Sequence, residues 1–204
     1  NIAQGTNTLI ATKMGLSLVD YVVTEAGFGA DLGAEKFMNI KCGYSGLKPD
    51  ALVLVATIRA LRHHGGAKKT EYNTPDLVRV KKGFENLEKH IENSKKFGLT
   101  PVVAINHFKT DTTEEIEFVM SECAKHGVMA LLSDCWARGG EGMRELAQAV
   151  VDIIESGVNR FKPLYDWNIP VEEKIMTIAK EIYGADDVEY SPKAREGLKV
   201  IKEL

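Results

Sequence analysis

Four short apolar runs, each rich in β-branched residues, alternate along the chain with longer amphipathic stretches. Apolar runs of this length and composition are typical of strands that are buried on both faces of a sheet. The pattern predicts strands at Tyr21–Thr24, Ala51–Ile58, Pro101–Ile105 and Val128–Leu132. Because a helix-like stretch follows each of them, we expect an α/β fold with a parallel sheet flanked by helices.

Capping residues mark several helix boundaries. The helix after the second strand is predicted to start with Thr74 as N-cap and Pro75 as its first residue, a pair that favours helix initiation. Thr112 and Glu115 have the spacing of a capping box, so the next helix is expected to begin there. Further helices are predicted at Thr8–Asp20, Glu141–Ser156, Val171–Tyr183 and Pro192–Lys202.

The pattern changes after Gly157, where prolines and a tryptophan interrupt the chain before its last two helices. We therefore expect an α/β domain at 1–157 and a helical appendage at 158–204. The first helix-like stretch has no strand before it to complete a βα unit, and the first residue is Asn1. These features indicate an α/β domain that is truncated at its N-terminus, in a piece of a longer polypeptide.

The composition narrows the class of protein. The 204 residues are 44% hydrophobic and 27% charged, as in ordinary globular proteins. A net charge of −3 without a basic block argues against a nucleic-acid partner. Three cysteines without a CxxC pair fit a reducing compartment, and no apolar run approaches the roughly 20 residues that span a bilayer. We expect a soluble cytoplasmic protein with no membrane partner.

The unusual residues follow the predicted strands, where ligands bind in open parallel sheets. After the first strand, glycines at Gly27, Gly29 and Gly33 let backbone amides approach a ligand and open a helix whose N-terminus attracts an anion. The alternative is a tight turn capped by Asp31. Arg59, expected at the end of the second strand, either orients an anionic group or pairs with Glu25.

Three aromatic residues lie in these loops rather than at periodic core positions: Phe28, Phe108 and Trp136. Together they fit a flat heterocycle, because each ring face contributes on the order of 1 kcal/mol beyond area burial. The alternative is that each ring folds back onto the core. Among the histidines, the adjacent His63 and His64 lack a partner at metal-ligand spacing, and no metal site is predicted.

Long stretches of these loops resemble the formate–tetrahydrofolate ligase family, also called formyltetrahydrofolate synthetase. The matching motifs run through essentially the whole chain, at residues 22–37, 55–66, 103–106, 108, 110–112, 136–137, 139–142 and 182–185. The resemblance implies a cytoplasmic, homotetrameric ligase of one-carbon metabolism with a fold related to P-loop and Rossmann proteins. It joins formate to tetrahydrofolate at the expense of ATP, giving 10-formyltetrahydrofolate by way of formyl phosphate.

The resemblance also implies roles for individual residues. Phe108 and Trp136 correspond to the pair that stacks on the pterin, with Phe28 and Gly29 beside them and Asn106 at the strand end. Gly27, Ala30 and Arg59 are expected near formyl phosphate. Lys109 stands where relatives often have proline, which leaves the shape of its loop open, and Arg62, His63 and Arg138 stand where lysine is frequent.

The resemblance implies ATP with Mg²⁺ as cofactor and leaves a monovalent cation open. The sequence contains no G-x-x-x-x-G-K-[ST] phosphate loop, which in the family lies upstream. We therefore expect ATP to be bound mostly by that upstream region, and this piece to supply the folate-binding side without ligase activity of its own.

Three other interpretations compete with this one. The spacing of Gly27, Gly29 and Gly33 approaches that of an NADP-binding oxidoreductase domain, but it is one residue longer than G-x-G-x-x-G. Asn106 after an apolar strand suggests a GTP-binding switch, but the sequence there departs from Asn-Lys-x-Asp. The third is a ligand-binding or assembly domain without catalytic activity.

Overall fold

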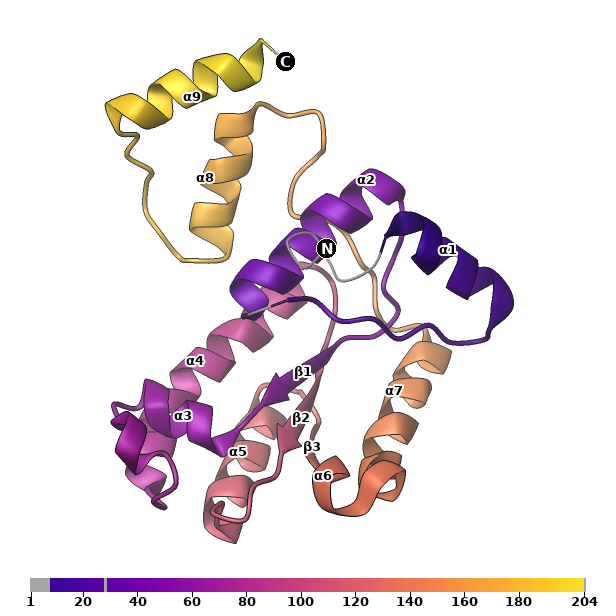
Figure 1. Ribbon diagram of the computed structural model, residues 1–204, viewed down its shortest axis with the longest axis vertical. Coiled ribbons are helices and arrows are strands. Elements are labelled where there is room, and N and C mark those ends of the chain that lie inside the picture. Colours follow the sequence, from indigo (N-terminus) through magenta and orange to yellow (C-terminus); the bar gives the residue numbers. More distant parts are fainter. Residues whose placement is uncertain (1–7, 28, 204) are drawn as a thin grey trace. The chain divides into compact units, whose positions relative to one another are not determined.

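The computed structural model describes residues 8–27 and 29–203. It contains a parallel sheet of three strands in the order β1-β2-β3 (Figure 1). The strands are β1 (Val53–Ala56), β2 (Val102–Asn106) and β3 (Ala130–Ser133). Leu54 lies opposite Val103, and Val103 lies opposite Ala130. The predicted α/β fold with a parallel sheet is confirmed.

Helices cover both faces of this sheet (Figure 1). On one face lie α4 (Leu77–Lys96), which contacts β1, and α5 (Thr113–Lys125), which contacts β3. On the other face, α7 (Arg144–Ser156) buries an apolar cluster against β2. That cluster consists of Val102, Ala104, Leu146 and Ala149. Because every strand is followed by a helix that returns across the sheet, the carboxyl ends of all three strands meet at one edge.

The chain divides into two compact units, Lys48–Phe161 and Asn1–Leu47 with Lys162–Leu204. The sheet and the helices named so far belong to the first of these. That unit also contains α3 (Ile58–His64), α6 (Cys135–Arg138) and short 3-10 turns at Lys69–Glu71 and Gly139–Met143. The other contains α1 (Leu9–Leu18), π-helical stretches at Ala30–Ala34 and Phe37–Cys42, α2 (Gly43–Ser45), α8 (Val171–Glu181) and α9 (Pro192–Lys202). The division into domains 1–157 and 158–204 stays a prediction.

A glycine pair joins α3 closely to α4. A Cβ atom on Gly83 would lie 1.9 Å from the carbonyl oxygen of Leu61, and one on Gly65 would lie 1.9 Å from that of Arg79. Neither position has room for a side chain, so the two backbones are in direct contact. The position of α3 relative to the sheet therefore depends on these two glycines.

The predicted strand at Tyr21–Thr24 is wrong. These residues form no strand, and Val23 is 92% exposed. Strand propensity in a β-branched run is realised only when a neighbouring backbone supplies hydrogen bonds. No described strand pairs with this segment, so the first predicted βα unit lacks its strand.

Local capping explains the other boundary differences. The second predicted strand ends at Ala56 rather than Ile58, because the Thr57 side chain accepts a hydrogen bond from Ala60 and starts α3. Arg59 therefore lies in a helix and not at the end of a strand. The long helix begins after Asp76 rather than Thr74, since the Asp76 carboxylate caps the amide of Arg79.

Two predicted helix starts are confirmed. The Thr112–Glu115 capping box forms as expected, and Ser191 caps α9 with Pro192 as its first residue. The remaining predicted helices are present with shorter bounds, at α1, α7 and α8.

Candidate functional site

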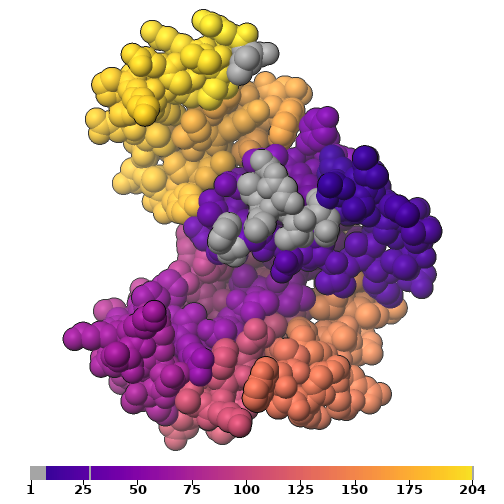
Figure 2. Space-filling model, in the orientation of Figure 1, coloured from indigo at the N-terminus to yellow at the C-terminus, as the bar shows by residue number. Residues whose placement is uncertain are grey.

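Three loops meet at the carboxyl edge of the sheet in the unit Lys48–Phe161. After β1 the chain turns directly into α3, and after β2 it forms the loop 107–111 before α5. After β3 it enters α6 and the turn Gly139–Met143, drawn in orange in Figure 2. The loops after β2 and β3 are joined at their roots, because the His107 amide donates a hydrogen bond to the carbonyl of Ser133. This is the edge at which ligands bind in open parallel sheets.

Arg59 stacks on the ring of Phe108. Its guanidinium carbon lies 3.9 Å from the ring centroid, within the range of a cation–π contact. The Nε of Arg59 is buried and has no hydrogen-bond partner among the described residues. Buried donors normally have a partner, so an arginine in this state retains capacity for an acceptor. The structure thus brings together two of the predicted site residues.

Trp136 projects from α6 and is 84% exposed. The ammonium group of Lys109 lies 5.8 Å from the ring. The loop that carries Trp136 is held tightly, since a Cβ on Gly142 would lie 2.4 Å from the Asp134 carbonyl oxygen. Within the described part of the chain, Phe108 and Trp136 are not in ring contact with each other, and the tryptophan does not fold back onto the core.

Two further polar residues line the same edge. His107 Nδ1 lies 3.5 Å from the Asp134 carboxylate, which links the second and third strand-end loops. Asn106 is the last residue of β2 and lies opposite Ser133. It is half-buried at the root of the loop that carries Phe108.

Arg62 forms a buried network beneath the loop 107–111. Its Nε and Nη2 atoms donate to the two carboxylate oxygens of Glu115, at 2.9 and 2.5 Å. Nη2 also donates to the carbonyl of Thr110 at 3.0 Å, and Nη1 donates to that of Tyr72 at 2.8 Å. Arg62 and Glu115 are both 0% exposed. The planar guanidinium therefore connects α3, the loop and the start of α5.

The network shifts two carboxyl groups in opposite directions. Burial acts to raise the pKa of Glu115, but hydrogen bonds from Arg62, the Asp76 amide and Thr112 outweigh it and lower that pKa to about 2. For Asp111, burial dominates and raises the pKa, although its carboxylate accepts a hydrogen bond from the Phe108 amide. Glu115 is thus held as an anion at neutral pH.

The glycine turn lies in the other unit. A Cβ on Gly33 would lie 1.4 Å from the Gly27 carbonyl oxygen, so the tight turn requires glycine at this position. The helical stretch starts at Ala30 with Gly29 as its N-cap, and no side chain caps it, so the predicted cap by Asp31 is absent. Gly27, Gly29 and Ala30 stay predicted anion contacts, and Phe28 lies outside the described residues.

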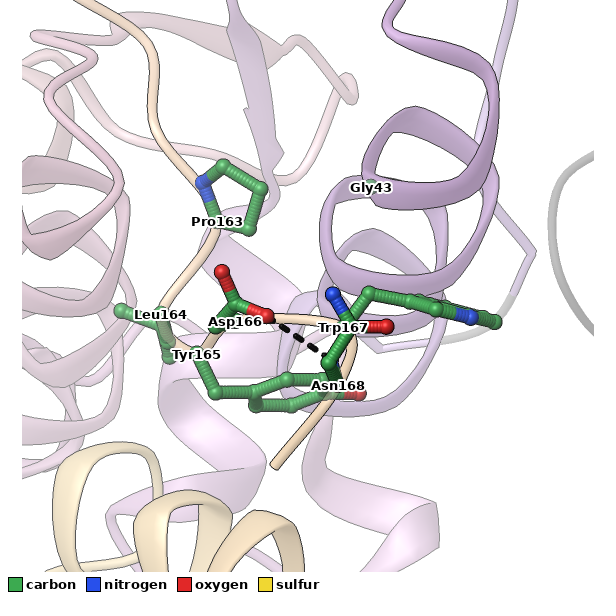
Figure 3. A pocket seen from close by; sticks show the side chains of 7 residues that line it. All are labelled: Gly43, Pro163, Leu164, Tyr165, Asp166, Trp167 and Asn168. Atoms are coloured by element: carbon green, nitrogen blue, oxygen red, sulfur yellow. Dashed lines mark hydrogen bonds between the residues drawn. The ribbon is translucent and has the colours of Figure 1, made fainter. Parts of the chain in front are cut away.

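A cavity of about 430 Å³ also occurs in this other unit (Figure 3). It is lined by Gly43 and residues 163–168. The Asp166 carboxylate accepts a hydrogen bond from the Asn168 amide, and the ammonium group of Lys174 lies 5.0 Å from the Trp167 ring. None of the predicted site residues lines this cavity. We therefore do not assign it to the site.

Comparison with known families decides the class of protein. The family model described as formate–tetrahydrofolate ligase matches residues 1–204. The chain belongs to this family. Membership indicates a ligase of one-carbon metabolism, with formate, tetrahydrofolate and ATP as the substrates of the family. It decides against the NADP-binding oxidoreductase and the GTP-binding switch.

The binding of ATP with Mg²⁺ stays an expectation from the family. No cluster of three His, Cys, Asp or Glu side chains suited to a metal ion occurs in 8–27 or 29–203. The sequence also has no phosphate-loop motif. We therefore derive no phosphoryl-transfer step from these residues.

No helix in the described ranges has the length and apolar character needed to cross a bilayer.

Two features of this edge go beyond what the sequence predicts. Lys109 lies over the ring of Trp136. Arg62, which stands where lysine is frequent in the family, is fully buried at the centre of the network. A charged residue on the apolar face of a short helix was the available signal, because such a charge requires a buried partner.

Proposed function

We propose that the carboxyl edge of the sheet supplies the folate-binding side of a formate–tetrahydrofolate ligase. Trp136 and Phe108 contact the pterin, and Asn106 hydrogen-bonds to the ligand or its loop. The observation that carries this proposal is the exposed Trp136 ring on a tightly held loop beside the loop of Phe108. A large aromatic surface open to water at a strand-end edge is typical of a ligand-binding surface.

Arg59 provides the anion contact in this proposal. Its buried Nε has no partner in the described residues, and its guanidinium lies on the Phe108 ring. A guanidinium so placed matches a phosphate oxygen in charge and geometry. Formyl phosphate is the reactive anion of the proposed reaction, so Arg59 would hold it beside the pterin.

The chemical step follows from that arrangement. The N10 amine of tetrahydrofolate attacks the formyl carbon, a C–N bond forms, the bond from that carbon to the phosphate oxygen breaks, and inorganic phosphate leaves. The N10 proton is transferred to a base that we do not assign. The residues of this chain act by holding the amine against the formyl carbon, and such positioning supplies up to several orders of magnitude in rate.

Calorimetric titration with tetrahydrofolate under anaerobic conditions tests the proposal. Trp136→Ala should raise Kd about tenfold, because one stacked ring face and its buried area contribute on the order of 1.5 kcal/mol. Where turnover is measured, KM for tetrahydrofolate should rise while KM for ATP stays unchanged.

Trp167→Ala is the matched control, since Trp167 is the other tryptophan of the chain and lies at the separate cavity. That variant should bind as the unmodified protein does. Equal affinity of Trp136→Ala and the unmodified protein would overturn the assignment of the pocket.

A further inference from the structure

Arg62 lies beneath the proposed folate site but does not belong to its surface. It is 0% exposed, so no ligand contacts it while the fold is intact. It makes four hydrogen bonds, to Glu115 twice, to Thr110 and to Tyr72. A buried arginine costs several kcal/mol to desolvate, which a hydrophobic residue would avoid. Because burying this arginine has an energetic cost, we expect it to have a role that an apolar side chain would not perform.

The contacts of Arg62 connect the two segments that carry Arg59 and Phe108, which stack on each other. Arg62 is on α3, three residues after Arg59. Its two hydrogen bonds to the Glu115 carboxylate fix the orientation of its guanidinium plane. From there Nη2 reaches the Thr110 carbonyl in the loop of Phe108. Asp111 continues the connection, because its carboxylate accepts from the Phe108 amide and lies 3.9 Å from Arg62 Nη1.

Glu115 locks the same network from the side of α5. Its carboxylate accepts hydrogen bonds from the amides of Thr112 and Asp76 in addition to those from Arg62. The start of α5, the start of α4 and the loop 107–111 are thereby tied to one carboxylate. A planar donor with several fixed N–H directions is needed at its centre, and lysine does not provide that geometry.

We propose that Arg62 is a positioning residue that sets the placement of the Phe108 ring relative to Arg59, and through it the affinity for the folate substrate. This inference rests on the proposed function. Arg62 acts through hydrogen bonds to the loop and never through contact with the ligand. Loosening the loop by even 1 Å is expected to weaken binding, since stacking and ion contacts depend on close approach.

The test separates positioning from stability by means of Arg62→Lys. Lysine keeps the positive charge beside Glu115 but has no planar fork to reach the Thr110 carbonyl as well. We expect Kd for tetrahydrofolate to rise about tenfold in a protein that remains folded. Amide hydrogen exchange in residues 107–112 should become faster, while exchange in α7 stays unchanged. Arg62→Met, which leaves Glu115 buried without its cation, should lose far more stability.

Two control variants make the result specific. Arg79→Met removes another arginine with two ion pairs, to Glu71 and Asp76, that does not contact the loop. Leu87→Ala destabilises the same unit through its buried core. Both should keep the original Kd wherever they are folded.

The proposal is overturned if Arg62→Lys binds tetrahydrofolate with unchanged Kd and unchanged exchange in 107–112, or if Leu87→Ala weakens binding equally. Trp136→Ala distinguishes this failure from that of the proposed function. If Trp136→Ala weakens binding and Arg62→Lys does not, only the positioning role is wrong. If neither affects binding, the folate site itself is misplaced.

Discussion

The contact between α3 and α4 allows a quantitative test by a single methyl group. In Gly83→Ala the new Cβ would meet the Leu61 carbonyl oxygen at 1.9 Å, and a second backbone atom, the amide nitrogen of Gly65, lies at 2.8 Å. Both obstacles are main-chain atoms, which cannot rotate away as a side chain would. The helices must therefore separate by about 1 Å, and α4 is pressed against the sheet on its other side.

The expected magnitude follows from two opposing effects. Alanine in a helix interior is favoured over glycine by about 1 kcal/mol. Overpacking in a rigid contact costs about 1–3 kcal/mol, occasionally more, and a clash between backbones belongs at the upper end. We expect Gly83→Ala to lower the free energy of unfolding by about 2 kcal/mol or more. For a chain of this size that corresponds to a fall in Tm of about 4–8 °C.

The matched control is Gly197→Ala in α9, where a Cβ would meet nothing within 4 Å. The same chemical change should there be neutral or stabilising by up to about 1 kcal/mol. Gly65→Ala, blocked by the Arg79 carbonyl at 1.9 Å, should behave as Gly83→Ala does.

Thermal unfolding followed by circular dichroism measures all three variants. Because the chain consists of two compact units, each transition should be assigned by hydrogen exchange in α4 and α9 before free energies are compared. If Gly83→Ala unfolds at the same temperature as the unmodified protein, or above it, then α3 and α4 are not in backbone contact and the reasoning fails.

Two further predictions concern ionisable groups. The pKa of Glu115 is lowered to about 2 from an ordinary value of 4.5, so the stability it contributes is complete above pH 4.5 and is lost as the pH falls toward 2; the loss amounts to about 3 kcal/mol. Urea unfolding at pH 7 and pH 3 should show that the difference in free energy of unfolding between the unmodified protein and Glu115→Gln is smaller at pH 3. An equal difference at both pH values would refute this. Burial raises the pKa of the Cys42 thiol to about 12 and that of Cys123 to about 11, whereas Cys135 is exposed. A thiol reagent at pH 8 should therefore label Cys135 alone in the native protein, with mass spectrometry of the peptides as readout; rapid labelling of Cys42 would contradict the buried position.

Local signals in the sequence predicted the elements whose causes are themselves local. The capping box of Thr112 and Glu115 forms as expected, as does the Ser191 cap, because both depend on residues three positions apart. Glu115 has a second role that spacing does not reveal. Its partner Arg62 lies 53 positions away, and the two meet only because α3 and α5 both pack against α4.

The elements that the sequence misplaces also depend on contacts between residues that are distant in the chain. Tyr21–Thr24 has the composition of a strand, but composition does not specify which backbone would pair with it. Thr74 is also a favourable N-cap residue, but the amide of Asp76 is bound by Glu115, which selects where α4 begins. At the site, aromatic residues in strand-end loops were recognisable from sequence, whereas the cations that lie over Phe108 and Trp136 were not.

The stacking of Arg59 on Phe108 has a consequence for the energetics of ligand entry. A planar ligand that uses this ring face must first evict the guanidinium, so its observed affinity is reduced by the strength of the contact, on the order of 1 kcal/mol. The evicted cation keeps its charge and is then available to pair with an anion. A ligand that delivers both a flat ring and an adjacent anion recovers that loss, and a neutral heterocycle of the same shape does not. The edge therefore discriminates in favour of molecules that combine the two.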